Sequence, residues 1–590
     1  MAHTCLNIDP ELFKMAPGRF ISKEILFKSR LSSIEKCIDS QTNSQIIVHN
    51  LAMTAFQTAD LYNFIRVLFN IQANNNRNFF LLPFYGFSST NTHFSIAYKD
   101  LGVTQISAND LKIDEKNDIL KTVAKAISFL NSINGSHLRI KLTSIFRRNL
   151  QHIFNNENPY NFILGCLTPA PIVDIEDDDR YLPFYTQPNW TRDSFMFGIL
   201  IYELFLNKSQ LEILQMFWTF NPMPNDNTLF ELAYKCIQHC PEKRPTSNEI
   251  IGFLNKTLNS ELTVYEQENS QILSDGQVND LIFQLDSEFF LLLQGYIYTT
   301  KKDDQNAIKI FTSKVLENNA NAINNTAVIL HKRKNQKCAS SLFKKAADLG
   351  FAVSQRNFAV ALLNGIGVEK NYDLHVKYLK EAASQGYAEA NFGLSYALKD
   401  MGDLEFVIFL RDSARKTYPC ALHMYGLACE KGLGMPGDKS INIFKVGADN
   451  HYPQCMNNYA TRITDVELSN KLWKEAAETG LKHAQYNYGV SLMMGRGVEK
   501  DEVRGAAYLK KASDQKYPLA MFDYALILRD GIGGVPKDEA AAEKLCKDAE
   551  KEWTMVEVAN SANSKTYAKL KEKFTAALAE RQNEFFIEKA

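Results

Sequence analysis

The chain has 590 residues, more than a single hydrophobic core usually serves, so at least two domains are expected. Its formal net charge is -1, which excludes a general electrostatic footprint for nucleic acid or for an anionic membrane surface. The ten cysteines include no CxxC pair and no accompanying histidine cluster, so we expect reduced thiols and no metal site.

The N-terminal residues MAHTCLNIDPELFKM have no apolar stretch of the kind that a signal peptide needs. The longest apolar run, from Ser194 to Leu206, is too short to span a bilayer and contains Glu203. The sequence therefore predicts a cytoplasmic protein that does not enter a membrane.

Two N-terminal segments read as strands of a known family. IIVHNL, residues 46–51, resembles the third strand of protein kinases, whose usual form is V-A-V-K-x-L. NFFLLPFYGF, residues 78–87, resembles the kinase strand N-I-V-x-L-Y-G-F. ILKTVAKAISFLNSINGSHL, residues 119–138, then resembles the helix that precedes the kinase catalytic loop.

Two later segments extend this resemblance to the tyrosine-kinase-like group. DSFMFGILIYEL, residues 193–204, is similar to the helix D-x-x-S-F-G-x-x-x-Y-E-L, and CIQHCPEKRPTSNEIIGFL, residues 236–254, is similar to the closing helix with its P-x-x-R-P-T core. The resemblance implies an α+β bilobal domain over residues 20–256, with an N-lobe at about 20–105 and a C-lobe at about 106–256. It also gives structural roles to Asp193, Gly198 and Arg244.

The N-lobe positions that would carry phosphoryl transfer hold unsuitable residues. The resemblance places His49 where kinases have the phosphate-binding lysine, and no lysine occurs between Cys37 and Tyr98. Phe64 stands at the glutamate position of the following helix, and we expect it to be a core residue. Because this chemistry depends on charged groups, the loss of both predicts a domain without catalysis.

The C-lobe positions lead to the same prediction. HLRIKLTSI replaces the catalytic loop, so that Arg139 takes the place of the base and Ser144 that of the metal-binding asparagine. The metal-binding aspartate would be Ile163 if a short insertion is allowed, and Glu157 is a possible substitute. No aspartate occurs between Ile119 and Val173.

Residues 257–302 are expected to be a linker. SELTVYEQENSQILSDGQVND is polar and reads as loop or frayed helix, whereas LIFQLDSEFFLLLQGYIYTT is apolar and reads as a helix that docks between two domains.

The C-terminal half contains internal repeats. Four copies of a glycine loop, GIGVEKN, GLGMPGD, GRGVEKD and GIGGVPKD, place glycine pairs at Gly365 and Gly367, Gly432 and Gly434, Gly495 and Gly497, and Gly531 and Gly533. Small-residue pairs that follow the loops are 36, 31, 34, 29, 36 and 36 residues apart, and the two short units are those without a glycine loop. Each unit is predicted to be an antiparallel helix pair whose chain reversal uses glycine at positive φ. In one unit the helices are expected at about residues 483–494 and 503–513.

These units resemble Sel-one-like repeats, relatives of the tetratricopeptide class, as in LWKEAAETGLKHAQYNYGVSLMMGRGVEKD. The resemblance covers about residues 303–550 and implies an all-α solenoid that binds other proteins on its concave face. Residues 551–590 read as charged capping helices.

The predicted function is a non-catalytic scaffold or adaptor in signalling, without cofactor or metal. The alternative is an atypical kinase or nucleotide-binding switch, and only then would ATP and magnesium bind. A third reading gives the kinase-like part only the role of a structural cap for the repeats.

Overall fold

A computed structural model describes residues 10–28, 32–74, 81–90, 93–100, 104–106, 110–135, 140, 144–147, 162–165, 189–206, 208, 210–218, 223–224, 228–238, 241–264, 270–285, 287–402, 405–416, 418–434 and 439–560. The chain forms two compact units, Met1–Asn450 and His451–Ala590, and each is described by itself. Among the described residues, no helix has both the length and the apolar character that crossing a bilayer requires.

The first unit begins with a five-stranded antiparallel sheet. Its strands are β1 (Phe20–Lys28), β2 (Ser32–Asp39), β3 (Gln45–Ala52), β4 (Phe84–Ser89) and β5 (His93–Lys99). Their order across the sheet is β1-β2-β3-β5-β4. Residues in β3 are almost all buried, which agrees with the apolar run that predicted a strand there.

Helix α1 (Thr58–Ala73) connects β3 to β4. Its buried residues include Leu61, Phe64, Ile65 and Leu68, whose three- and four-residue spacing forms one apolar face. The helix begins where the Asp60 carboxylate accepts a hydrogen bond from the Gln57 backbone amide at 3.1 Å. Its apolar face therefore packs on the sheet rather than facing solvent.

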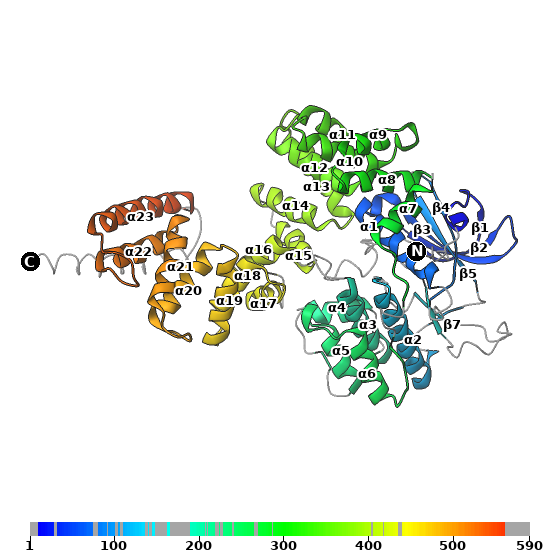
Figure 1. Ribbon diagram of the computed structural model, residues 1–590, viewed down its shortest axis with the longest axis horizontal. Coiled ribbons are helices and arrows are strands. Elements are labelled where there is room, and N and C mark those ends of the chain that lie inside the picture. The colour runs from blue at the N-terminus through cyan, green and yellow to red at the C-terminus, as the bar shows by residue number, and fades with distance from the viewer. Residues whose placement is uncertain are drawn as a thin grey trace, which may run out of the picture. The chain divides into compact units, whose positions relative to one another are not determined.

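A mainly helical part follows. It contains α2 (Ile113–Ser132), α3 (Asn189–Leu206), α4 (Gln210–Trp218), α5 (Thr228–Cys236) and α6 (Ser247–Thr257), and a small antiparallel sheet of β6 (Thr104–Gln105), β7 (Ile145–Arg147) and β8 (Phe162–Leu164). Helix α3 contacts α2, α4 and α5, and α2 also contacts α6 (Figure 1). The apolar run that was too short for a membrane is thus a buried core helix.

Two helices lie in the predicted linker, α7 (Asp275–Phe283) and α8 (Glu288–Thr300). The rings of Phe289 in α8 and Phe87 in β4 have centroids 4.8 Å apart, and Phe289 lies 5.5 Å from Phe94 in β5. On its other side α8 contacts α9 (Asp304–Phe311) and α10 (Ala320–Lys332). The linker is therefore a packed element between the sheet and the first helices of the repeats (Figure 1).

Polar contacts join α10 to the start of α1. The Asn325 side-chain amide donates to the Thr58 hydroxyl at 2.8 Å, and the Asn321 amide donates to the Met53 backbone carbonyl at 3.1 Å. Thr58 and Asn321 are both buried, so these bonds satisfy polar groups that have left water. They fix the direction in which the first repeat meets the sheet.

The helices of the repeats continue in pairs. In the first unit they are α11 (Gln336–Asp348), α12 (Ala352–Asn364), α13 (Tyr372–Ser384), α14 (Ala388–Asp400), α15 (Phe406–Arg415), α16 (Pro419–Glu430) and α17 (Ser440–Asp449). In the second unit they are α18 (Pro453–Ala460), α19 (Val466–Glu478), α20 (Lys482–Met494), α21 (Glu502–Asp514), α22 (Pro518–Asp530) and α23 (Glu539–Asn560). Helix α23 runs through residue 551, the predicted start of the capping helices, without a break. Residues 561–590 lie outside the described residues.

Candidate functional site

His49, which the resemblance places where kinases have a lysine, has apolar neighbours in the sheet. His49 is fully buried in β3 and pairs with Ile34 of β2 and with Ile96 of β5, which in turn pairs with Phe87 of β4. Directly paired residues of antiparallel strands point to the same face, so His49 belongs to a row of apolar neighbours. Each of these three neighbours is at most 3% exposed. This face has the character of a packed interior and not of a phosphate site.

The second N-lobe position is also apolar. Phe64 is 4% exposed, and its ring centroid lies 6.4 Å from that of Phe94. The aromatic ring thus fills space between α1 and the sheet, where a charged side chain would need a partner.

Two predicted C-lobe positions lie within the small sheet. The Ser144 carbonyl accepts a hydrogen bond from the Gly165 amide at 2.9 Å, and Ser144 is buried. Ile163 lies in the middle of β8, is fully buried and pairs with Phe146. Ile163, predicted to stand where the metal-binding aspartate is lost, is thus an apolar core side chain with no atom that could bind a metal ion. Arg139 and Glu157 lie outside the described residues.

Arg244 contacts two parts of the helical region. The Arg244 guanidinium donates to the backbone carbonyls of Gln238 and Thr191 at 2.8 and 3.1 Å, and it lies over the Phe195 ring at 4.9 Å. Asp193 is fully buried at the start of α3. Arg244 therefore ties the segment before α6 to the first turn of α3, a structural role that needs no substrate.

Gly198 marks the closest approach of α3 to α5. A Cβ atom added there would lie 2.6 Å from the Cys236 Cβ and 2.8 Å from the Ala233 carbonyl oxygen.

We expect Gly198→Ala to lower the free energy of unfolding by about 1–3 kcal/mol, because the helices cannot separate without losing contacts. The matched control is Gly252→Ala in α6, where an added Cβ meets no atom within 4 Å. That change should raise stability by about 0.5–1 kcal/mol, since alanine is the better helix former. Urea unfolding followed by circular dichroism compares the two; equal effects would contradict the close approach.

The first glycine of each loop ends a helix. Gly365, Gly495 and Gly531 have φ of 72°, 66° and 69° and serve as left-handed C-caps, and Gly432 has φ of 74°. This conformation is strained for other residues, so the repeated glycine is required by the chain reversal.

The second glycine of three loops packs against an earlier helix. An added Cβ at Gly367 would overlap the backbone of Gln336 at the start of α11, and one at Gly533 would overlap the backbone of Glu502 at the start of α21. At Gly497 it would meet Val466 at the start of α19. Each of these loops therefore contacts the N-terminus of the first helix of its own pair, which explains why glycine recurs at this place.

Gly434 departs from this pattern. Its φ lies outside the left-handed range, and an added Cβ would meet the Cys429 Sγ at 2.6 Å instead of an earlier helix. Its predicted equivalence to the other second glycines is therefore wrong. The sequence also differs here, since Met435 and Pro436 follow Gly434.

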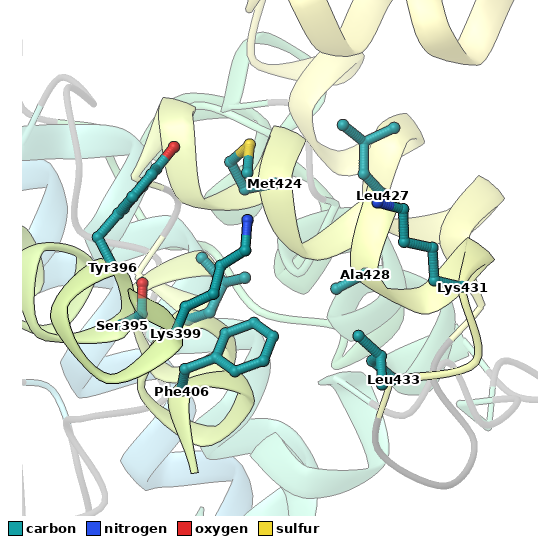
Figure 2. Close-up of a pocket in the computed structure, with 10 residues that line it drawn as sticks. Ser395, Tyr396, Lys399, Phe406, Met424, Leu427, Ala428, Lys431 and Leu433 are labelled. Atoms are coloured by element: carbon teal, nitrogen blue, oxygen red, sulfur yellow. The ribbon is translucent and has the colours of Figure 1, made fainter. Parts of the chain in front are cut away.

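A pocket lies between α14, α15 and α16, and we call it the α14–α16 pocket. Its lining comprises Ser395, Tyr396, Lys399, Phe406, Leu410, Met424, Leu427, Ala428, Lys431 and Leu433. Figure 2 shows Tyr396, Lys399 and Phe406 on one side and Leu427, Lys431 and Leu433 on the other. Phe406, Leu410 and Ala428 are buried and form an apolar base, whereas both lysines are exposed.

The hydroxyl groups of Ser395 and Tyr396 differ in whether they could bind a ligand. The Ser395 hydroxyl already donates to the Phe392 carbonyl at 2.7 Å. Tyr396 is 42% exposed, and partial burial, with Cys420 and Asp400 nearby, raises the pKa of its phenol above the ordinary value. Tyr396 therefore stays neutral at physiological pH and can donate a hydrogen bond. Within the described part of the chain there is no group of three histidine, cysteine or carboxylate residues that could hold a metal ion.

The fold and its glycine-capped helix pairs define an α-solenoid in the C-terminal half. The repeats are Sel1 repeats: the Sel1 repeat family model matches residues 352–387, 421–441, 482–517 and 518–549. Each matched stretch contains one of the four glycine loops, which confirms the repeats that loop sequence and spacing predicted.

Two solved structures are similar to the chain. A protective antigen present in uropathogenic Escherichia coli strains, displaying an SLR fold, has 17% identity and a TM-score of 0.41, covering 63% of this chain and 81% of its own. A Sel1 repeat protein from Oxalobacter formigenes has 22% identity and a TM-score of 0.30, covering 44% of this chain and 96% of its own. Among curated proteins, none matches the chain.

Sequence reasoning missed the α14–α16 pocket. Its lining comes from three helices and a loop, and no motif joins them. The available signal was a departure from the pattern of α20–α22, because Lys399 and Ala428 stand where those helices have Met493 and Ile527.

Proposed function

We propose that this chain is a non-catalytic scaffold or adaptor protein in cytoplasmic signalling. In this proposal a degenerate kinase-like domain and the repeat solenoid together form a platform for other proteins. The observation that carries it is the buried apolar row around His49, which occupies the face where a kinase needs a phosphate-binding cation.

Agreement between sequence resemblance and local structure supports the kinase-like part of the proposal. Residues that resemble the third kinase strand lie in β3, Phe64 lies in a helix after it, and residues 84–87 lie in β4. Of the segments that resemble two C-lobe helices, residues 193–204 lie within α3 and residues 236–254 overlap α6. Contacts of Arg244 with the first turn of α3 are consistent with the structural role that the resemblance gives it.

The repeats support the platform. Sel1 repeat proteins generally mediate protein–protein interaction, and solenoids commonly offer an extended concave surface for it. The proposal places partner proteins on that surface and assigns no cofactor to the chain.

Nucleotide binding is the direct test. Full-length protein at millimolar ATP and magnesium is expected to show no thermal shift and no phosphotransfer. A ligand at a hundredfold above its dissociation constant would stabilise the native state by about 2.7 kcal/mol. Differential scanning fluorimetry and a radiolabelled phosphate-transfer assay make the measurement, with an active kinase as the positive control.

A reproducible shift with ATP would instead support the nucleotide-binding switch. Phosphotransfer that disappears in Glu157→Gln would overturn the non-catalytic proposal, because that substitution removes the substitute carboxylate and changes little else in size.

A further inference from the structure

The place of the α14–α16 pocket is occupied by apolar side chains in the repeat of α20, α21 and α22. This repeat has a glycine loop after α20, and we call it the complete unit. In the second unit, the buried residues Ala506, Leu509 and Ile527 form a cluster. Partly buried apolar residues pack against this cluster: Tyr486, Val490, Met493, Tyr524, Ile532 and Val535. This cluster closes the space between α20, α21 and α22.

The residues of α14 and α16 at the corresponding positions are smaller than those of α20 and α22, or are charged. Helices α14 and α20 both have 13 residues, so Lys399 takes the place of Met493. Tyr425 and Gly432 correspond to Tyr524 and Gly531, which aligns Ala428 with Ile527. Ala428 is smaller than Ile527, so an apolar side chain that packs in the complete unit is reduced to a methyl group here. Lys399 is about as long as Met493 but ends in an ammonium group, so a charged side chain replaces an apolar one.

The pocket also differs from the complete unit in its charge. Lys399 and Lys431 both line it, and the ten lining residues include no carboxylate. Among the described residues neither lysine takes part in an ion pair. At the corresponding place α22 has Asp530, so Lys431 reverses the charge of the complete unit. The result is an apolar base with two available ammonium groups (Figure 2).

We propose that the α14–α16 pocket binds a peptide segment of a partner protein that inserts one apolar side chain and carries acidic residues on both sides of it. The inserted side chain would contact Phe406, Leu410 and Ala428, and the flanking carboxylates would meet Lys399 and Lys431. Met424 and the Tyr396 hydroxyl lie at the same opening, where a flexible thioether and a hydrogen-bond donor accommodate the peptide. This inference rests on the proposed platform function and names one binding site within it.

The probe is a fluorescent synthetic peptide with one leucine flanked by two glutamates on each side. Fluorescence anisotropy with the full-length protein is expected to show saturable binding that weakens at high salt. Replacing the leucine by serine should weaken binding roughly tenfold to a hundredfold, since a buried leucine supplies most of the apolar contact. Replacing the glutamates by lysines should weaken it at least about tenfold.

The decisive variant refills the pocket with the residues of the complete unit, Lys399→Met together with Ala428→Ile. These are the residues that α20 and α22 already carry in the same fold, so the variant should unfold at the wild-type temperature or above. Its affinity for the acidic peptide should fall at least about tenfold. The matched control is Lys380→Met, an exposed lysine on α13 outside the pocket, which should leave affinity unchanged.

Unchanged affinity in the refilled variant, or equal binding of the lysine-flanked peptide, would overturn the proposal. Absence of any saturable binding would overturn it as well. None of these results concerns nucleotide or phosphotransfer, so failure of this site is distinguishable from failure of the proposed function, which the ATP measurements decide.

Discussion

Replacing Phe289 by alanine is expected to lower the free energy of unfolding of the first unit by about 3–5 kcal/mol. The ring is fully buried and contacts Phe87, Phe94 and Phe290, with centroids 4.8, 5.5 and 5.4 Å away. It lies where helix α8 joins the sheet, so a cavity there removes contacts that neighbouring side chains cannot replace.

Hydrogen-exchange mass spectrometry on the full chain measures this effect segment by segment. Amides in β4, β5 and α8 should lose protection in Phe289→Ala, whereas those in α20 to α22 of the second unit should not change. The control is Phe283→Ala in α7, because Phe283 is 39% exposed and packs only edge-on against Tyr298 at 5.6 Å, so its loss should cost about 1–2 kcal/mol, less than that of Phe289. Equal protection in Phe289→Ala and wild type would show that α8 does not hold the sheet.

The second large effect is expected for Gly367→Ala, which should destabilise the first unit by about 2–5 kcal/mol. Two costs add: alanine at φ of 67° costs about 1–2 kcal/mol, and the overlap of its Cβ with the Gln336 backbone costs about 1–3 kcal/mol. Neither can be relieved without moving the loop from the start of α11.

Gly350→Ala separates the two costs. Gly350 has φ of 88° and an added Cβ there meets no atom within 4 Å, so only the conformational cost of about 1–2 kcal/mol remains. Urea unfolding of both variants should therefore differ. A Gly367→Ala effect no larger than that of Gly350→Ala would mean that the loop does not pack on α11.

The repeat helices were predictable from sequence because their signals are local. The expected helices at residues 483–494 and 503–513 are observed as α20 and α21, with ends that differ by one residue at most. Glycine at a helix end and small residues at fixed spacing act within a few residues of each other, so no knowledge of distant contacts is needed. The Sel1 repeat match confirms the same units.

Features that depend on distant contacts were not predictable. The position of Ile163 was predicted from spacing with a short insertion, whereas its burial in β8 depends on pairing with Phe146, which a local pattern does not show. Gly434 shares the loop pattern of its counterparts, yet its contact with Cys429 determines a different backbone. The α14–α16 pocket combines Lys399 of α14 with Ala428 of α16, and a single-sequence pattern records each of them only as an unremarkable substitution.

Contacts between α10 and the start of α1 have a consequence for the amount of protein in a cell. Since Thr58, Asn321 and Asn325 bond across the junction, damage to the sheet also weakens the first repeats that rest on it. A loss of one or two kcal/mol can change steady-state abundance several-fold through chaperones and proteases. Inherited substitutions in the buried sheet should therefore reduce the level of the whole chain, and with it every interaction of the repeats, even though no binding residue has changed.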